Sequence, residues 1–77
     1  MEPLQQFGEN VRRSRQERGW TQEDLAAKTN LAVVQVSRIE RGKREIRLTT
    51  LVRLLDGLDE QPDALLQGLL RQTPDDP

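Results

Sequence analysis

The chain has 77 residues, a length that suits one domain and leaves no room for a second. It contains neither cysteine nor histidine, which excludes disulfides, thiolate or imidazole metal sites, cysteine nucleophiles and histidine-based acid–base catalysis. The longest apolar run covers residues 31–34, far below the ~20 residues needed to cross a bilayer. We therefore expect a cytoplasmic protein with no membrane association, no cofactor or metal, and no small-molecule ligand.

The net charge of −1 conceals an asymmetry along the chain. Residues 1–55 carry eleven Lys/Arg against seven Asp/Glu, a net charge of +4, whereas residues 56–77 carry one Arg against six acids, a net charge of −5. Local charge governs attraction to phosphates because charges are screened beyond ~8–10 Å at physiological salt. The pattern is compatible with a nucleic-acid-binding face and equally with ordinary solvated surfaces.

The first predicted helix covers about residues 4–18. Leu4, Phe7 and Val11 recur there at helical spacing. Gly19 follows directly and is expected to end the helix as a C-terminal cap.

Two short helices are predicted next, over about residues 22–28 and 32–41. Thr21 can cap the first of them, and Asp24, three residues later, completes a pattern typical of a capping box. Asn30 tolerates the left-handed conformation that a tight turn between the two helices requires.

Two more helices are predicted over about residues 48–58 and 62–71, after a polar loop that begins at Gly42. Leucines at helical spacing mark both, and Pro62 suits the first turn of the last one. Residues 72–77 contain two prolines and two acids and are expected to form a disordered acidic tail.

The pair of short helices has the organisation of a helix-turn-helix. On the second of them, Val36 and Ile39 are expected to face the core, while Val34, Ser37 and Arg38 face outward. A major groove about 12 Å wide admits such a helix, and its first turns contact the base edges.

A family resemblance extends over about sixty positions of the chain. The residues that support it most strongly are Arg15 with Gly19, the segment 21–26 and the segment 36–44. The chain resembles the Cro/C1-type helix-turn-helix family, which includes the lambdoid phage repressors. The resemblance implies an all-α, five-helix bundle of the lambda-repressor-like DNA-binding type over residues 1–71. Within the family, the size and the loop 43–48 resemble the controller proteins of restriction–modification systems.

The resemblance also implies roles for individual residues. Gln22 is expected to contact a phosphate at a helix N-terminus, where exposed N–H groups attract anions; the alternative is a solvated first-turn glutamine. Lys43 and Arg44 are expected to bind phosphates, with Arg44 able to enter the minor groove. Arg15 and Glu40 match positions that form a structural ion pair. The full set expected to contact DNA is Thr21, Gln22, Val33, Val34, Gln35, Ser37, Arg38, Arg41, Lys43 and Arg44.

The sequence departs from the family at the start of the helix expected to contact bases. Ala32 replaces the usual Ser/Thr-type cap, and Val33 and Val34 replace a polar pair. Valine methyls can pack on the thymine C5-methyl, so discrimination partly through thymine positions is predicted, with polar contacts from Gln35 and the residues that follow. The alternative for Val33 is burial against the preceding helix.

A homodimer is expected because one module of this size buries only about 600–1,000 Å² on DNA. Two copies on a palindrome would place their recognition helices about 34 Å apart. The last predicted helix carries leucines around more of its circumference than one small core can cover, although all of them could pack internally. The expected interface residues are Leu58, Leu65, Leu66, Leu69 and Leu70.

The predicted function is that of a sequence-specific, autoregulatory transcription regulator that binds double-stranded DNA. Activation through RNA polymerase would use an acidic patch such as Asp56, Asp59 and Glu60. The alternative is an antitoxin-like module that neutralises a partner protein and autoregulates. An enzyme is not expected, because a Gly-rich phosphate loop and the usual nucleophile–base pairs are missing.

Overall fold

A computed structural model describes residues 2–69, which form five helices and no strand. The helices are α1 (Pro3–Glu17), α2 (Gln22–Thr29), α3 (Val33–Glu40), α4 (Leu48–Leu58) and α5 (Pro62–Leu66). This confirms the predicted all-α fold. The first three helices begin and end within one residue of the expected positions, and α4 has the expected bounds.

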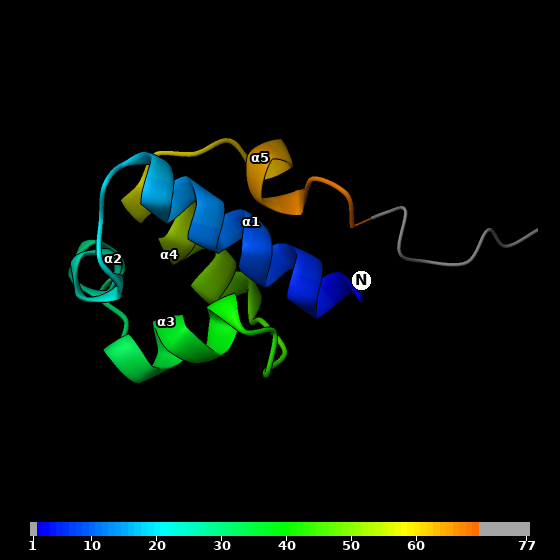
Figure 1. Cartoon of the computed structure of the whole chain (residues 1–77), viewed down its shortest axis with the longest axis horizontal. Helices are drawn as coiled ribbons and strands as arrows, with labels where there is room; N and C mark the ends of the chain where they lie inside the picture. Colours follow the sequence, from blue (N-terminus) through cyan, green and yellow to red (C-terminus); the bar gives the residue numbers. More distant parts are fainter. Residues whose placement is uncertain (1, 70–77) are drawn as a thin grey trace, which may run out of the picture.

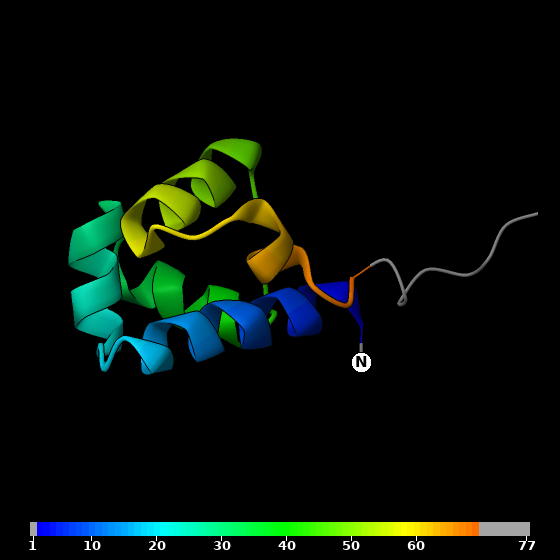
Figure 2. The same ribbon diagram turned by 90° about the horizontal axis from the view of Figure 1, so that it is seen from above.

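Helix α1 runs through the middle of the molecule, with α3 on one side and α5 on the other (Figure 1). Helix α2 closes one end of the bundle, where it contacts both α3 and α4 (Figure 2). Consequently α3 is supported from behind by α1 and α2, and its remaining side is open to solvent.

The core consists of apolar side chains contributed by all five helices and by the turn before α3. Among the described residues, those with buried apolar side chains are Phe7, Val11, Leu25, Ala26, Leu31, Val36, Ile39, Leu54, Leu58 and Leu65. Trp20 packs against this cluster, and the cationic groups of Arg18 and Lys28 lie 5.9 and 5.5 Å from the centroid of its ring. One compact core therefore fixes the relative positions of the helices.

Glycine at position 8 allows α1 and α3 to approach closely. A Cβ atom at Gly8 would lie 2.5 Å from the backbone oxygen of Ile39 and 2.6 Å from that of Glu40. Such distances are shorter than van der Waals contact, so any side chain at position 8 would push α3 away from α1.

Helix α5 is shorter than predicted. It ends at Leu66, whereas the sequence predicted an end near residue 71. The buried side chain of Asn10 explains the end: its amide Nδ2 donates hydrogen bonds of 2.8 Å to the backbone oxygens of Leu65 and Gln67. In a continued helix the Leu65 oxygen would accept from the residue four positions later. Gly68 then adopts a left-handed conformation, with φ of 84°. The predicted tail, residues 72–77, lies outside the described residues.

Within residues 2–69, no helix is long and apolar enough to cross a membrane.

Candidate nucleic-acid interface

The turn between α2 and α3 is formed as the sequence predicts. Asn30 adopts the left-handed conformation with φ of 58°, and Leu31 directly after it is buried in the core. At the other end of α2, the Thr21 hydroxyl accepts from the Asp24 backbone N–H at 3.0 Å, and the Asp24 carboxylate accepts from the Thr21 backbone N–H at 2.9 Å. These bonds to Thr21 lower the pKa of Asp24. Both ends of α2 are therefore fixed by local contacts.

Ala32 is the N-cap residue of α3, and its side chain makes no capping hydrogen bond. Instead, the Oε1 atom of Gln35 accepts a hydrogen bond of 3.0 Å from the Ala32 backbone N–H, which is one half of a capping box. Gln35 is predicted to contact a base. This bond uses one of the two lone pairs of the Gln35 oxygen, so the other lone pair and the two Nε2 donors can contact a base edge.

One side of α3 is buried and the other is exposed. Val36 and Ile39 are buried, at 0% and 5% exposure, as predicted from helical spacing. On the opposite side Val33 and Val34 are 40% and 51% exposed, so the alternative that Val33 is buried against α2 is wrong. Arg38 is exposed as well. Helix α3 therefore presents the methyl groups of Val33 and Val34 and the guanidinium of Arg38 to solvent.

An ion pair attaches α3 to α1. The Arg15 guanidinium donates from Nε to Glu40 Oε2 at 2.6 Å and from Nη2 to Glu40 Oε1 at 2.9 Å, and the two side chains are only 11% and 3% exposed. The hydrogen bond to Glu40 is the main cause that raises the pKa of Arg15 above its usual value. The ion pair that the family resemblance implies is therefore present.

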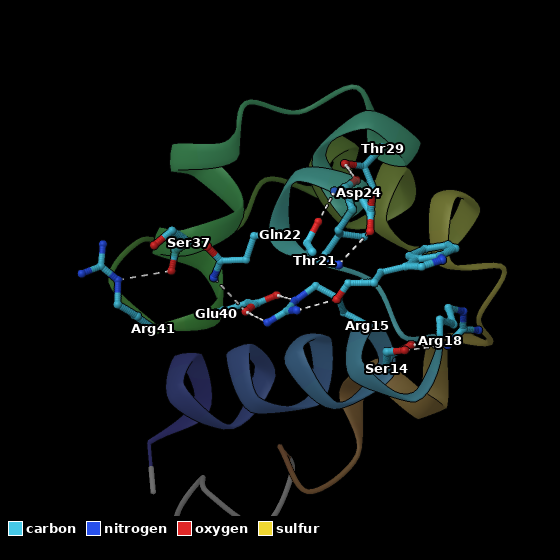
Figure 3. A network of polar contacts seen from close by, with 12 residues as sticks. Ser14, Arg15, Arg18, Thr21, Gln22, Asp24, Thr29, Ser37, Glu40 and Arg41 are labelled. Atoms are coloured by element: carbon cyan, nitrogen blue, oxygen red, sulfur yellow. Dashed lines mark hydrogen bonds and ion pairs between the residues drawn. The ribbon is translucent and has the colours of Figure 1, made fainter.

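Two further contacts extend this ion pair to α2. Arg15 Nη1 donates to the backbone oxygen of Trp20 at 2.7 Å, and Gln22 Nε2 donates to Glu40 Oε1 at 3.1 Å. Figure 3 shows the Arg15 and Gln22 side chains converging on Glu40 from α1 and α2. The contact from Gln22 was not foreseen, since the two expectations for this side chain were a phosphate contact and a solvated position. The network fixes the orientation of α3 relative to both supporting helices.

Positive charges continue past the end of α3. Gly42 has φ of 67°, which directs the chain into the loop where Lys43 and Arg44 are both exposed. Arg41 is exposed too, and its Nε donates to the Ser37 backbone oxygen at 3.3 Å. Ser37 itself is half-buried.

A cavity of about 360 Å³ separates the C-terminal half of α3 from the loop and from α4. Arg47 and Arg53 line it together with Gln35, Arg38 and Arg44. Arg47 and Arg53 were not predicted as site residues, because neither the loop sequence nor helical spacing within α4 reveals which residues face the cavity.

The leucines expected at the dimer interface divide into three groups. Leu58 and Leu65 are fully buried, at 0% exposure, so their assignment to the interface is wrong: their side chains fill the monomer core. Leu66 is 40% exposed, and Leu69 is partly buried against the core. Leu70 lies outside the described residues.

Among the large apolar side chains of residues 2–69, the most exposed is Leu48 on α4, a helix where no interface residue other than Leu58 was predicted. Leu48 is 74% exposed and Val52 is 48% exposed. One turn apart on α4, they lie on the same side of the helix. A shallow cavity of about 280 Å³ connects Leu48 with Leu66 and Leu69. We call Leu48, Val52, Leu66 and Leu69 the α4–α5 apolar face.

The acids of the predicted polymerase patch are not equivalent. Asp56 and Asp59 are exposed. Glu60 is half-buried and accepts a hydrogen bond from the Ser14 hydroxyl at 2.7 Å, with Arg18 Nη1 3.6 Å away. Glu60 therefore serves to attach the α4–α5 connection to α1.

The two short helices, the left-handed turn and the exposed side of α3 define the architecture of a helix-turn-helix protein. The helix-turn-helix family model matches residues 11–65, and the chain belongs to this family. No protein of curated function matches the chain.

Solved structures with the same fold include restriction–modification controller proteins. The chain is 35% identical to controller protein C.AhdI from Aeromonas hydrophila over 80% of this chain and 94% of that one, with a TM-score of 0.78. It is 32% identical to controller protein C.Esp1396I in a tetramer bound to its natural 35 base-pair operator, over 90% and 91% of the two chains, with a TM-score of 0.77. The wild-type C.Esp1396I structure gives 32% identity over 90% of each chain and the same TM-score of 0.77.

Proposed function

We propose that this chain is a transcription regulator that binds a palindromic DNA operator as a homodimer, acts in the cytoplasm and controls its own expression. One observation carries the proposal: α3 exposes Val33, Val34 and Arg38 while the Arg15–Glu40–Gln22 network holds its other side on α1 and α2. A recognition helix needs this combination of an open face and a fixed support. The similarity to a controller protein crystallised on its operator supports the same function. No catalytic activity forms part of the proposal.

The proposed contacts to DNA are of two kinds. Base edges are contacted by the exposed side of α3, through the methyls of Val33 and Val34 and the polar groups of Gln35, Ser37 and Arg38. Phosphates are contacted on either side of it, by residues at the start of α2 and past the end of α3. The phosphate-binding set is Thr21, Gln22, Arg41, Lys43 and Arg44.

The homodimer is proposed to form through the α4–α5 apolar face. Leu48 and Val52 are too exposed to contribute to the monomer core, and contiguous apolar surface of this kind marks an interaction site on a small soluble protein. A twofold axis beside α4 would present two recognition helices to successive turns of the major groove, about 34 Å apart.

Selection of bound duplexes from a random pool at fixed salt tests this function. We expect an enriched inverted repeat whose half-sites are about 10 base pairs apart, centre to centre, as two recognition helices on one face of the duplex require. Enrichment of no sequence over the starting pool would contradict the proposal.

The valines predict a dependence on thymine methyl groups. Replacing thymine by uracil in the half-sites of the selected operator removes only the C5-methyl, so apolar contacts to Val33 and Val34 would be lost while hydrogen bonds remain. We expect operator binding to weaken by several-fold in a gel-shift titration. The matched control is uracil in the flanking DNA, which should change nothing. Equal affinity for thymine and uracil half-sites would show that the valines do not contact methyl groups.

A further inference from the structure

Four arginines surround the cavity between α3 and α4. Arg38 comes from α3, Arg44 and Arg47 come from the loop, and Arg53 comes from the second turn of α4. The Thr49 and Thr50 residues of the first turn of α4 complete the polar part of the wall. The cavity thus combines arginines from three consecutive segments, which are brought together because α3 and α4 both pack on α1 and α2.

These four guanidinium groups are not neutralised within the described part of the chain. Over residues 2–69, neither ion pair of the protein involves any of them, and none donates a side-chain hydrogen bond to a protein group. Glu45 is the one acid that lines the cavity, and it too is in neither ion pair. By contrast, each of the three guanidinium nitrogens of Arg15 donates to a protein acceptor.

Unpaired like charges around one cavity repel each other and destabilise the folded state. A bound anion would reverse that cost, because each guanidinium offers five N–H donors in a fork that matches phosphate oxygens. The charge and the donor chemistry of the cavity therefore suit a phosphate group.

The position of the cavity indicates which phosphate it takes. Gln35 and Arg38, on its α3 wall, belong to the helix proposed to contact base edges. Arg53 follows Val52 by one position and so lies about 100° around α4 from it, away from the α4–α5 apolar face. The cavity therefore adjoins the recognition helix, and its Arg53 wall lies away from the face that a second copy would cover. Arg47 lies between the two surfaces, because it also lines the shallow cavity beside Leu48.

We propose that Arg47 and Arg53 bind backbone phosphates of the operator, so that the contact with DNA extends from α3 and the loop onto α4. This inference rests on the proposed function and adds to it two residues that the helix-turn-helix pattern does not supply. Such contacts increase affinity for any DNA sequence, since phosphates carry no base information. Each phosphate contact also steepens the salt dependence of binding, by about 0.9 in the slope of log K against log salt concentration.

The test compares the dimeric protein with an Arg47→Gln, Arg53→Gln double variant, using operator and unrelated duplexes at several KCl concentrations. We expect the slope to fall by about 1.8 per protomer, and the affinities for operator and unrelated DNA to fall by the same factor. Arg13→Gln is the matched control, because Arg13 bonds to Asn10 and Gln67 on the side of α1 that faces α5. Its slope should equal that of the wild type.

Two results would overturn the inference. A double variant that binds operator with the wild-type slope would show that neither arginine contacts a phosphate, while leaving the proposed function intact. The second result combines two observations: inorganic phosphate raises the melting temperature of the wild type but not of the double variant, and the double variant keeps the wild-type salt slope. The cavity would then bind a free anion and not the DNA backbone. A wild-type chain that binds no duplex would instead refute the proposed function itself.

Discussion

Glu40→Ala is expected to unfold the domain before it has any effect on DNA specificity. The substitution leaves the Arg15 guanidinium buried with two of its donors unpaired, and it removes the acceptor of Gln22. Loss of one partner of a buried ion pair costs about 3–5 kcal/mol. A small domain has only ~5–15 kcal/mol of stability in total, so urea denaturation should show a large fall in the free energy of unfolding.

Two further variants give this prediction its controls. Glu17→Ala removes an exposed acid on α1 and should change stability by less than about 0.5 kcal/mol. An Arg15→Met, Glu40→Met double variant replaces both charges by apolar groups and should be more stable than Glu40→Ala alone, because no unpaired charge remains. Equal melting temperatures for Glu40→Ala and Glu17→Ala would contradict the structural role of the ion pair.

Leu48→Glu is expected to abolish dimerisation while leaving the monomer folded. Leu48 is 74% exposed in the isolated chain, so a charge there costs the monomer little, whereas at a twofold interface it would bury two carboxylates close together. Since a monomer can occupy only one half-site, we expect operator affinity to fall more than about 100-fold, or ~2.7 kcal/mol. Sedimentation and gel-shift titration measure the two effects.

A duplex with a single half-site provides the control for Leu48→Glu. Wild type and variant should bind it equally, because its recognition by one protomer does not involve the apolar face. A variant that remains dimeric at micromolar concentration would show that the α4–α5 apolar face is not the interface.

The sequence was sufficient to predict the bounds of α1 to α4, because the residues that determine these bounds lie within or next to each helix. Spacing of apolar residues sets each helix, and the caps at Thr21, Asn30 and Gly42 act within a few residues of the boundaries that they define. The predicted length of α5 was too great, because the end of this helix depends on Asn10, which lies more than fifty residues earlier in the chain. No local pattern contains that information.

The errors at the dimer interface have a related physical cause. The apolar residues of α4 span about 160° of its circumference at 100° per residue, so spacing alone cannot tell which of them face the core. The structure places Leu58 inside and leaves Leu48 and Val52 outside. In the same way, the position of Arg53 at the cavity shared with α3 follows from how α3 and α4 pack on α1 and α2, and not from the sequence of either helix.

The candidate site was foreseen in its outline more than in its contacts. The inward positions of Val36 and Ile39 followed from helical spacing. The pairing of Arg15 with Glu40 spans 25 positions and came from the family resemblance, since no periodicity connects residues so far apart. The hydrogen bond from Gln22 to Glu40 was missed because a glutamine at a helix N-terminus gives no signal of a buried acceptor on another helix.

The central claim is that the exposed side of α3 distinguishes one base sequence from another. Its most direct test is a Ser37→Ala, Arg38→Ala double variant, titrated with the selected operator and with unrelated DNA at one salt concentration. Neither side chain belongs to the core, so the variant should remain folded by circular dichroism. A good base contact contributes about 1–3 kcal/mol of discrimination. We therefore expect preference for the operator to fall about tenfold or more, whereas a folded variant that captures the operator with undiminished preference would contradict the account.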